Sequence, residues 1–401
     1  MKRLRVLSVV NTLYFGGAEC RLLSLAKEMN SDRFDQTVLT LKRVDTERER
    51  RLGTLRPHFA SANVAVESLD IDAPEVGSAH GSAAKCVRSV PRLSRTLIKL
   101  AAYIRANHID LLDTHCGTAN KVGIAAAILT RRPVIATTYG LEIFRPLWLW
   151  RLSESVLLTL ATAIVTDSDA VAAQIRRQLL RPRRIAVIPN GIEPPKAYRK
   201  REEMHAQFGI PSDSRIRVVG QVASLTPRKG QLVLLDAAEQ LVRTEPHVHF
   251  LICGYARDPL AYERALHART ADLGLTSRVH FVGYPGPIGD VYNAIDIQVH
   301  PSIEESLPQA IIEGMALGKP AVATAVAGIP TMVSDGATGV IVRPGDAQAL
   351  AAGIRRLLRD TSLAARLGLA AQQRYWERYT DARMARSLEK LFEDVARPSA
   401  A

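Results

Sequence analysis

The sequence has few cysteines and no long apolar run. Its 401 residues include 4 cysteines, and no two of them form a CxxC pair. This scarcity excludes a disulfide-stabilised scaffold and a cysteine-based zinc site, and it is typical of a reducing cytoplasm. No stretch approaches the roughly 18 uncharged apolar residues that a membrane-spanning helix needs. The apolar run at the start is too short for a signal peptide, so we expect a buried first strand and a cytoplasmic protein.

Common phosphate and hydrolase motifs are also missing. The sequence has no Walker A motif, no GxGxxG dinucleotide fingerprint and no GxSxG nucleophile motif. Histidine and acidic residues do not cluster at metal-ligand spacing, so we expect neither a metal site nor a bound cofactor. These absences exclude the P-loop NTPases, the classical dinucleotide-binding enzymes and the serine hydrolases of the α/β type.

The composition is that of a folded protein with two domains. Hydrophobic residues make up 47% of the chain, enough to bury sizeable cores, and 401 residues correspond to two or three domains. The formal net charge is +13. Residues 1–195 hold most of the excess, with 28 Lys and Arg against 18 Asp and Glu. This half could attract nucleic acid, anionic lipid or a phosphorylated substrate, or it could simply have a basic, solvated surface.

Short apolar runs alternate with helix-patterned stretches along the whole chain. Because these runs are continuous and not alternating, they predict parallel sheets covered by helices on both faces. This alternation is interrupted by a proline-rich basic stretch near 190–200, which we interpret as a linker. The fold class is therefore α/β, with domains at 1–192 and 193–373 and a C-terminal helix over 374–401. The predicted strands are Leu4–Val10, Gln36–Leu41, Leu111–Asp113, Val134–Thr138, Ala163–Thr166, Ile185–Ile188, Arg217–Gln221, Val248–Cys253, Val279–Val282, Ile295–Val299, Ala321–Ala323 and Gly339–Val342.

Two carboxylates flank a predicted helix start in the second half of the chain. Ser306 can cap this helix, with Pro308 in its first turn, which leaves Glu305 in the loop and Glu313 two turns along. The free amides of the first turn, near Gln309 and Ala310, would then point at an anion between the two carboxylates. A nucleotide sugar has this layout, with hydroxyls at both ends and phosphate in the middle. A solvated helix with an incidental glutamate is the alternative.

Three further features lie where strands end. Gly16 and Gly17 form a tight turn between the first strand and a helix, where backbone amides can approach an anion. Lys229, in Pro227-Arg228-Lys229-Gly230, follows a strand ending near Val222 and can neutralise a diphosphate, or it can be surface charge. His115 ends a strand and should face a cleft, although a lone histidine is more often structural.

Taken in order, these motifs resemble the retaining glycosyltransferases of family 4, which have two Rossmann-like domains in the GT-B arrangement. The likeness covers nearly the whole chain and is densest in its second half. It implies that the first domain binds the acceptor, that the second binds the nucleotide sugar, and that the C-terminal helix over 374–401 crosses back to the first domain. It rests on the following stretches: Gly16-Gly17-Ala18-Glu19, Asp113-Thr114-His115, Ile188-Pro189-Asn190-Gly191-Ile192, Pro227-Arg228-Lys229-Gly230, Glu305 with Glu313, Gly314-Met315-Ala316-Leu317-Gly318-Lys319-Pro320, Gly328-Ile329-Pro330 and Asp335-Gly336-Ala337-Thr338-Gly339.

The resemblance implies a role for each matching position. Glu313 would bind the ribose of the donor nucleotide, and Glu305 would contact the donor sugar. Lys229 and the amides near Gln309 and Ala310 would hold the diphosphate, with Gly16 and Gly17 closing on it. The implied catalytic residues are Glu305, Lys229 and His115. The implied donor-binding residues are Glu313, Gly16, Gly17, Arg228, Ser224, Ser306, Leu307, Gln309, Ala310 and Tyr139. The donor would be a UDP-sugar, used without a metal.

Three positions depart from the family pattern. Ser224 stands where the family usually has an arginine five residues before the lysine, a place that Arg228 could fill. Tyr139, in Thr138-Tyr139-Gly140, replaces a histidine that often contacts the donor sugar. Thr331 follows Gly328-Ile329-Pro330 in place of the usual glutamate. Two Asp-x-Asp patterns, Asp70-Ile71-Asp72 and Asp167-Ser168-Asp169, are interpreted as structural, the second as a helix N-cap, and not as metal sites.

The acceptor is the least specified part of the function. A lipid-linked or cell-envelope glycan is our first expectation and a soluble small molecule the second. Residues 85–105 resemble a basic amphipathic helix able to lie on anionic lipid, and Trp148 and Trp150 could anchor it, although a basic surface helix is an equal alternative. The other readings of the chain are a nucleotide-sugar epimerase, an inactive relative or a nucleic-acid-binding protein. The last lacks any recognisable nucleic-acid motif, so no nucleic acid is expected as a partner.

Overall fold

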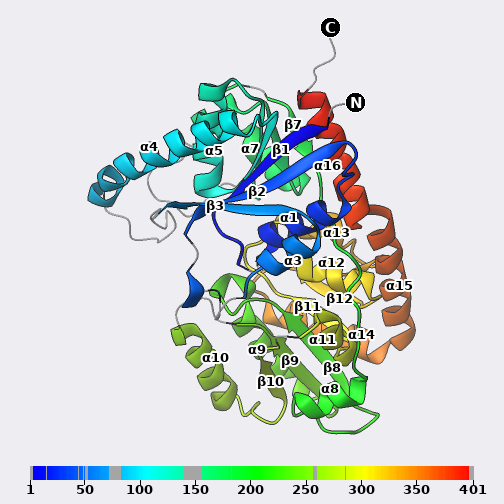
Figure 1. Cartoon of the computed structure of the whole chain (residues 1–401). Coiled ribbons are helices and arrows are strands. Elements are labelled where there is room, and N and C mark those ends of the chain that lie inside the picture. The colour runs from blue at the N-terminus through cyan, green and yellow to red at the C-terminus, as the bar shows by residue number, and fades with distance from the viewer. Residues whose placement is uncertain are drawn as a thin grey trace. The chain divides into compact units, whose positions relative to one another are not determined.

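A computed structural model describes residues 3–396 except 15, 44, 48, 50–52, 72–82, 140–154, 182, 256–259 and 285, and it describes no side chain of 83–92 or 260. Asp72, Gly140, Trp148 and Trp150 therefore lie outside the described residues. The chain forms two compact units, labelled by element in Figure 1. Unit 1 is Met1–Gly191 with Asp381–Ala401, and unit 2 is Ile192–Thr380.

Unit 1 is built on a parallel sheet of seven strands in the order β3-β2-β1-β4-β5-β6-β7. The inner strands are apolar and buried along most of their length, as expected of a sheet covered on both faces. The order reverses between β1 and β4, which are neighbours in the sheet. The strands are β1 (Leu4–Val10), β2 (Phe34–Lys42), β3 (Ala65–Ile71), β4 (Leu111–His115), β5 (Val134–Thr137), β6 (Ala163–Thr166) and β7 (Ile185–Val187).

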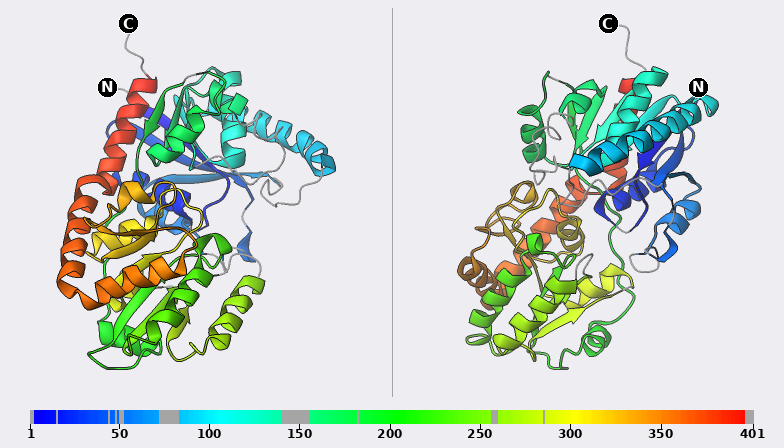
Figure 2. Two further views of the ribbon diagram at one scale, coloured as in Figure 1. Left: turned by 180° about the vertical axis from the view of Figure 1, so that it is seen from behind. Right: turned by 90° about the vertical axis from the view of Figure 1, so that its left-hand side faces the viewer.

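Two hydrophobic clusters cover this sheet. One joins β1 and β2 to α1 (Gly17–Glu28), α3 (Arg56–Ser61) and α16 (Asp381–Ala396). The other joins the sheet to α4 (Ala83–Ala106), α5 (Gly117–Thr130) and α7 (Asp169–Arg176). In Figures 1 and 2, α16 runs beside α1 and α4 lies against α5. The last helix of the chain is thus part of the first unit's core.

Unit 2 repeats the design with six parallel strands in the order β10-β9-β8-β11-β12-β13. Its strands are β8 (Arg217–Val222), β9 (Val248–Cys253), β10 (Val279–Val282), β11 (Ile297–His300), β12 (Ala321–Thr324) and β13 (Gly339–Val342). Its helices are the 3-10 turn η1 (Pro227–Lys229), α8 (Arg201–Gln207), α9 (Gln231–Val242), α10 (Leu260–Asp272), α11 (Ile288–Ala294), α12 (Gln309–Ala316), α13 (Ile329–Met332), α14 (Ala347–Arg359) and α15 (Thr361–Arg378).

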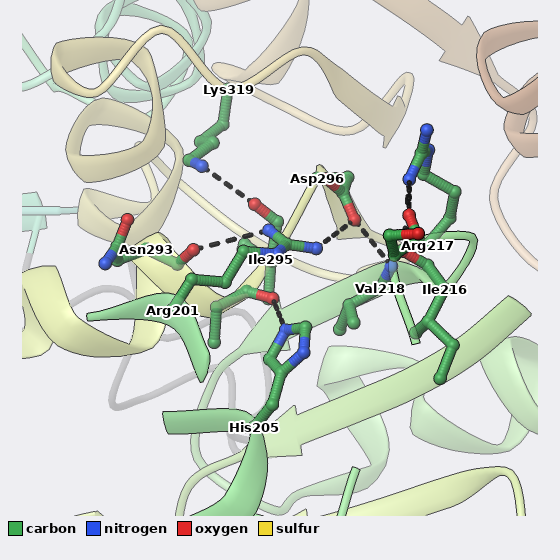
Figure 3. Close-up of polar contacts among 11 residues, drawn as sticks. Arg201, His205, Ile216, Arg217, Val218, Asn293, Ile295, Asp296 and Lys319 are labelled. Carbon is green, nitrogen blue, oxygen red and sulfur yellow. Dashed lines mark hydrogen bonds and ion pairs between the residues drawn. The ribbon is translucent and has the colours of Figure 1, made fainter. Parts of the chain in front are cut away.

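Polar contacts fix the amino ends of the unit 2 strands (Figure 3). The Asp296 carboxylate accepts from Arg201 Nη2 at 2.6 Å and from the Val218 amide at 2.7 Å, which ties α8 to β8. Lys319 donates to the Ile295 carbonyl at 2.8 Å, and burial lowers the pKa of its ammonium. This network lies at the edge of the sheet opposite the strand ends that carry the candidate site.

The predicted two-sheet α/β architecture is confirmed, with local differences. β3 was not among the predicted strands, because its burial alternates along an edge strand and gives no continuous apolar run. β11 begins at Ile297 and not at Ile295. The C-terminal segment divides later than predicted, because residues 374–380 belong to unit 2 and only α16 joins unit 1. No helix in the described part of the chain is long and apolar enough to cross a bilayer.

Candidate functional site

The predicted residues of the second half gather at the carboxyl ends of β8 and β11. These two strands are neighbours, and the strand order reverses between them. In an open parallel sheet this switch point is where ligands bind, since the loops after the two strands turn away from each other there. The loop after β8 carries Ser224 and Lys229, and the loop after β11 carries Glu305. The strand order of unit 2 therefore determines where the candidate site lies.

A glycine allows the two loops to meet. Gly230 follows η1 with φ +71, and a Cβ at this position would lie 1.9 Å from the Pro301 carbonyl oxygen. Only glycine combines this left-handed conformation with so close an approach. The Ile303 amide then donates to the Arg228 carbonyl at 2.8 Å. The Pro227-Arg228-Lys229-Gly230 stretch is thus held against the loop that carries Glu305.

Glu305 is paired with both cations of that stretch. Its Oε2 accepts from Lys229 Nζ, and its Oε1 lies 3.6 Å from Arg228 Nη1. The side chains of Glu305 and Lys229 are 10% and 14% exposed, so this pair is largely shielded from solvent, whereas Arg228 is 48% exposed. The structure therefore brings these three predicted residues together. An anionic ligand here would meet a lysine that is already positioned.

Glu313 lies on the second turn of α12. Its Oε2 accepts from Tyr292 Oη at 3.2 Å and its Oε1 from Gln309 Nε2 at 3.2 Å. Burial raises the pKa of Glu313 from its ordinary 4.5 to about 7, although both hydrogen bonds lower it. A carboxylate that costs this much to ionise is more often found at a functional site than in a purely structural role.

The helix that carries Glu313 begins at Gln309, after Glu305, so the amides of Gln309 and Ala310 lie in its first turn. Such amides have no partner within a helix and point along its positive end. Ser306 does not cap this helix, contrary to our expectation. Pro308 is at the cap position, and Ser306 lies two residues too early, with its carbonyl accepting from the Gly328 amide at 3.0 Å. Leu307 is buried in the core beneath.

Three residues of this site were missed in the sequence. Tyr292 bridges Glu313 and the Ala310 carbonyl, which it reaches at 2.5 Å. His300 ends β11, and burial, followed by the charge of Lys229, lowers its pKa to about 3. Gln221 donates to the Lys229 carbonyl at 2.8 Å. A strand-terminal position was the only sequence signal for His300 and Gln221, and Tyr292 had none because it comes from a separate helix.

Two of the departures from the family pattern have structural roles. The Ser224 carbonyl accepts from Gln231 Nε2 at 3.0 Å, so its backbone helps to fix the start of α9. Thr331 donates to the Gly328 carbonyl at 2.6 Å, and its own carbonyl accepts from Arg374 Nη2 at 2.6 Å. Neither contact supplies a charge to the site.

In unit 1, the predicted glycine turn opens α1. Gly16 is its N-cap residue in extended conformation, and a Cβ on Gly17 would meet no described atom within 4 Å. Tyr139 follows β5, and the Arg21 guanidinium lies 5.9 Å from its ring centre. Burial raises the pKa of the Tyr139 phenol well above its ordinary value.

His115 is the last residue of β4 and is 4% exposed. Its Nε2 lies 2.8 Å from Asp113 Oδ2. Of the two Asp-x-Asp patterns, the second contains a helix cap as predicted, since Ser168 accepts from the Val171 amide at 3.4 Å. No group of three or more His, Cys, Asp or Glu side chains able to hold a metal ion occurs in the described part of the chain.

Comparisons with known families agree with this geometry. A family model described as "Glycosyl transferases group 1" matches residues 200–374, and one described as "Glycosyl transferase 4-like domain" matches residues 16–191. Among curated relatives, a D-inositol 3-phosphate glycosyltransferase of Corynebacterium efficiens is 28% identical over 307 residues, 71% of each chain. One from Salinispora tropica is 29% identical over 303 residues, 69% of this chain and 62% of the relative.

Solved structures share the fold. A glycosyltransferase of Rickettsia africae matches all of this chain and all of its own with a TM-score of 0.83 and 19% identity. Alr3699/HepE of Anabaena, solved in complex with UDP and glucose, covers 98% of this chain and 100% of its own with a TM-score of 0.79 and 24% identity. Two domain models in the family order and two sheets of this topology lead to one assignment. The chain belongs to the family 4 glycosyltransferases, and it is a glycosyltransferase with the GT-B fold.

Proposed function

We propose that this chain transfers a sugar from a UDP-sugar to an acceptor hydroxyl with retention of configuration. The observation that carries the proposal is the order of groups at the switch point of unit 2. The first amides of α12 lie between Glu305 and Glu313 along the chain, and Lys229, from the loop after β8, donates to Glu305. Lysine and helix amides stabilise charge on a departing diphosphate, while a carboxylate at each end can accept hydrogen bonds from hydroxyls. Alr3699/HepE, a neighbour in fold, was solved with UDP and glucose, which supports uridine as the base.

Donor binding is tested by thermal shift with UDP, other nucleoside diphosphates and their sugars. A ligand that binds the native state at about 100 times its Kd stabilises it by about 2.7 kcal/mol. We expect UDP and a UDP-sugar to raise the melting temperature of the wild type and to lose this effect in Glu313→Ala. Glu377→Ala, on the surface of α15, is the matched control and should keep the shift. A wild type that no nucleotide stabilises, with magnesium or with EDTA, would contradict the proposal.

The reaction type is tested by the products. A transferase consumes the UDP-sugar only as acceptor is supplied, whereas an epimerase isomerises it without acceptor. Nuclear magnetic resonance of the new glycosidic bond reports its anomeric configuration, and inversion would refute the retaining mechanism. The EDTA arm tests our further proposal that no metal is required.

For the acceptor, we propose a glycan or glycolipid of the cell envelope, with a soluble small molecule as the second candidate. The curated relatives carry the name D-inositol 3-phosphate glycosyltransferase, so that compound belongs in the panel beside lipid-linked glycans. Transfer to the polyol phosphate alone would favour the soluble acceptor. Transfer only to lipid-linked substrates would favour the envelope acceptor.

We propose that α4 contributes peripheral contact with an anionic membrane. Arg95, Lys99 and Arg105 are exposed, and Ile98, between them, is 68% exposed, while Leu100 and Ile104 face the core. This is the pattern of a basic helix with an apolar residue available for lipid. Sedimentation with anionic vesicles, but not with zwitterionic ones, is the expected result. Arg95→Glu with Lys99→Glu should abolish it, and equal sedimentation of both proteins would contradict it.

A further inference from the structure

Unit 1 has its own topological switch point, between β1 and β4, and buried polar atoms lie there without partners. Asn11 directly follows β1, and His115 ends β4. Within the part of the chain that the structure describes, Asn11 Oδ1 and His115 Nδ1 are buried and have no hydrogen-bond partner. The same holds for Tyr139 Oη, beyond the end of the neighbouring β5. Leaving such an atom unpaired in a protein interior costs about 1–3 kcal/mol. Among them, His115 Nδ1 lies at the strand ends where open parallel sheets bind ligands, so a polar ligand can supply its missing partner.

His115 is held from behind by a chain of buried side chains. Gln36 Nε2 donates to Ser8 Oγ at 2.9 Å, Ser8 Oγ donates to Asp113 Oδ2 at 3.4 Å, and the same Oδ2 lies 2.8 Å from His115 Nε2. The four residues come from β2, β1 and β4, and Ser8 pairs with Asp113 in the sheet register. All four are less than 9% exposed. Gln36 donates to Ser8, and Ser8 in turn donates to Asp113, so the Ser8 hydroxyl acts once as acceptor and once as donor.

This series of hydrogen bonds determines which ring nitrogen of His115 carries the proton. An ionised carboxylate only accepts hydrogen bonds, and Ser8 already donates to Asp113 Oδ2. His115 must therefore donate through Nε2–H. In the neutral imidazole this leaves the lone pair on Nδ1, which is the atom without a partner. An acceptor nitrogen suits a ligand hydroxyl, since a hydroxyl donates one hydrogen bond.

We infer that Asp113 is a positioning residue that fixes His115 as the Nε2–H tautomer, so that Nδ1 accepts a hydrogen bond from a hydroxyl of a bound sugar or polyol. This inference rests on the proposed glycosyl transfer for its kinetic consequence. The tautomer of His115 is a property of the free protein and does not depend on that transfer. His115 touches the ligand in this scheme, and Asp113 acts only through His115.

The tautomer is tested by nitrogen-15 nuclear magnetic resonance on histidine-labelled protein, with His115→Gln to assign the ring. In the wild type we expect one tautomer, with Nε2 protonated and Nδ1 bare. Asp113→Ala should give a mixture of tautomers. Asp113→Asn should restore the wild-type form, because its amide oxygen can still accept from both Ser8 and His115. An unchanged tautomer in Asp113→Ala, or a wild type with Nδ1 protonated, would overturn the inference.

The kinetic arm measures UDP release from UDP-glucose with saturating acceptor or, if none is known, with water. We expect kcat to fall by about 10- to 100-fold in Asp113→Ala, with the KM for donor unchanged and with recovery in Asp113→Asn. Asp110→Asn is the matched control, since Asp110 precedes the same strand at its opposite end, where its Oδ2 accepts from the backbone amide of Arg5 at 3.0 Å. Full turnover in Asp113→Ala would overturn the positioning role.

The two proposals fail in different ways. A wild type that neither binds UDP nor releases it from UDP-glucose would refute the proposed transfer while leaving the tautomer result to decide the role of Asp113. A wild type that transfers sugar while Asp113→Ala keeps both tautomer and kcat would refute the positioning role and leave the transfer intact.

Discussion

At the scale of single residues, Glu313 links the candidate site to pH. Its carboxyl has a raised pKa of about 7 in the folded protein against an ordinary value of 4.5. Between these values the folded state holds a proton that the unfolded state has released. The contribution of Glu313 to the free energy of unfolding is therefore fully present below about pH 4.5 and is lost as pH rises through about 7.

We expect the free energy of unfolding of unit 2 in the wild type to fall, relative to Glu313→Gln, by up to about 3 kcal/mol between pH 4.5 and pH 8. The amide has the same shape and does not titrate, so the contributions of all other groups cancel in the comparison. Urea unfolding of both proteins at several pH values measures the difference. Parallel curves would show that Glu313 has an ordinary pKa.

A second residue-scale feature is the backbone at Cys116, directly after His115. Its φ of 60° and ψ of 156° fall in a region that glycine occupies readily and other residues at a cost of about 1–3 kcal/mol. We expect Cys116→Gly to stabilise unit 1 by about 1 kcal/mol after the extra entropy of glycine in the unfolded chain is counted. Cys116→Ala removes the thiol but keeps the strain, and it should show no gain. Equal stability of the two variants would contradict this.

At the scale of elements, α16 belongs to unit 1 although it follows unit 2 in the sequence. Phe392 is fully buried and meets Phe34 edge-on, with ring centres 6.2 Å apart. Glu389 Oε1 accepts from the backbone amide of Asn30 at 2.7 Å, and Asp394 Oδ2 lies 2.8 Å from Arg184 Nη2. A helix from the end of the chain thus completes the core that the first strand begins.

Phe392→Ala should destabilise unit 1 by about 3–5 kcal/mol, because it removes a large buried ring and leaves a cavity. Lys390→Ala, exposed on the same helix, should change stability by less than about 0.5 kcal/mol. Chemical denaturation followed by circular dichroism measures both. A small effect of Phe392→Ala would mean that α16 is not part of the unit 1 core in solution.

At the scale of the whole molecule, each hydrophobic cluster among the described residues is built from one unit. Two clusters belong to unit 1 and three to unit 2. A chain with two separate cores is not expected to unfold as a single two-state system. A ligand that binds one unit and a substitution in the other can therefore shift different unfolding transitions.

In scanning calorimetry we expect UDP to raise the transition of unit 2, which holds Glu305 and Glu313. Phe392→Ala should lower the transition of unit 1 and leave the UDP-dependent one in place. Glu313→Ala should abolish the response to UDP without shifting the unit 1 transition. A single transition that moves in both experiments would show that the units unfold together.

The apolar pattern of the sequence was enough to predict the two parallel sheets, because strands buried between covering helices are continuous apolar runs. The sequence also placed Lys229, Glu305 and Glu313 after the right strands, since loop chemistry and helix starts are local. Three things depended on the tertiary structure. Tyr292 reaches Glu313 from another helix, and Phe392 of α16 meets Phe34 in the core of unit 1. The Gln36-Ser8-Asp113-His115 chain exists only because three strands distant in sequence are neighbours in one sheet. Local patterns record the path of the backbone, whereas contacts between distant segments are decided when the segments pack.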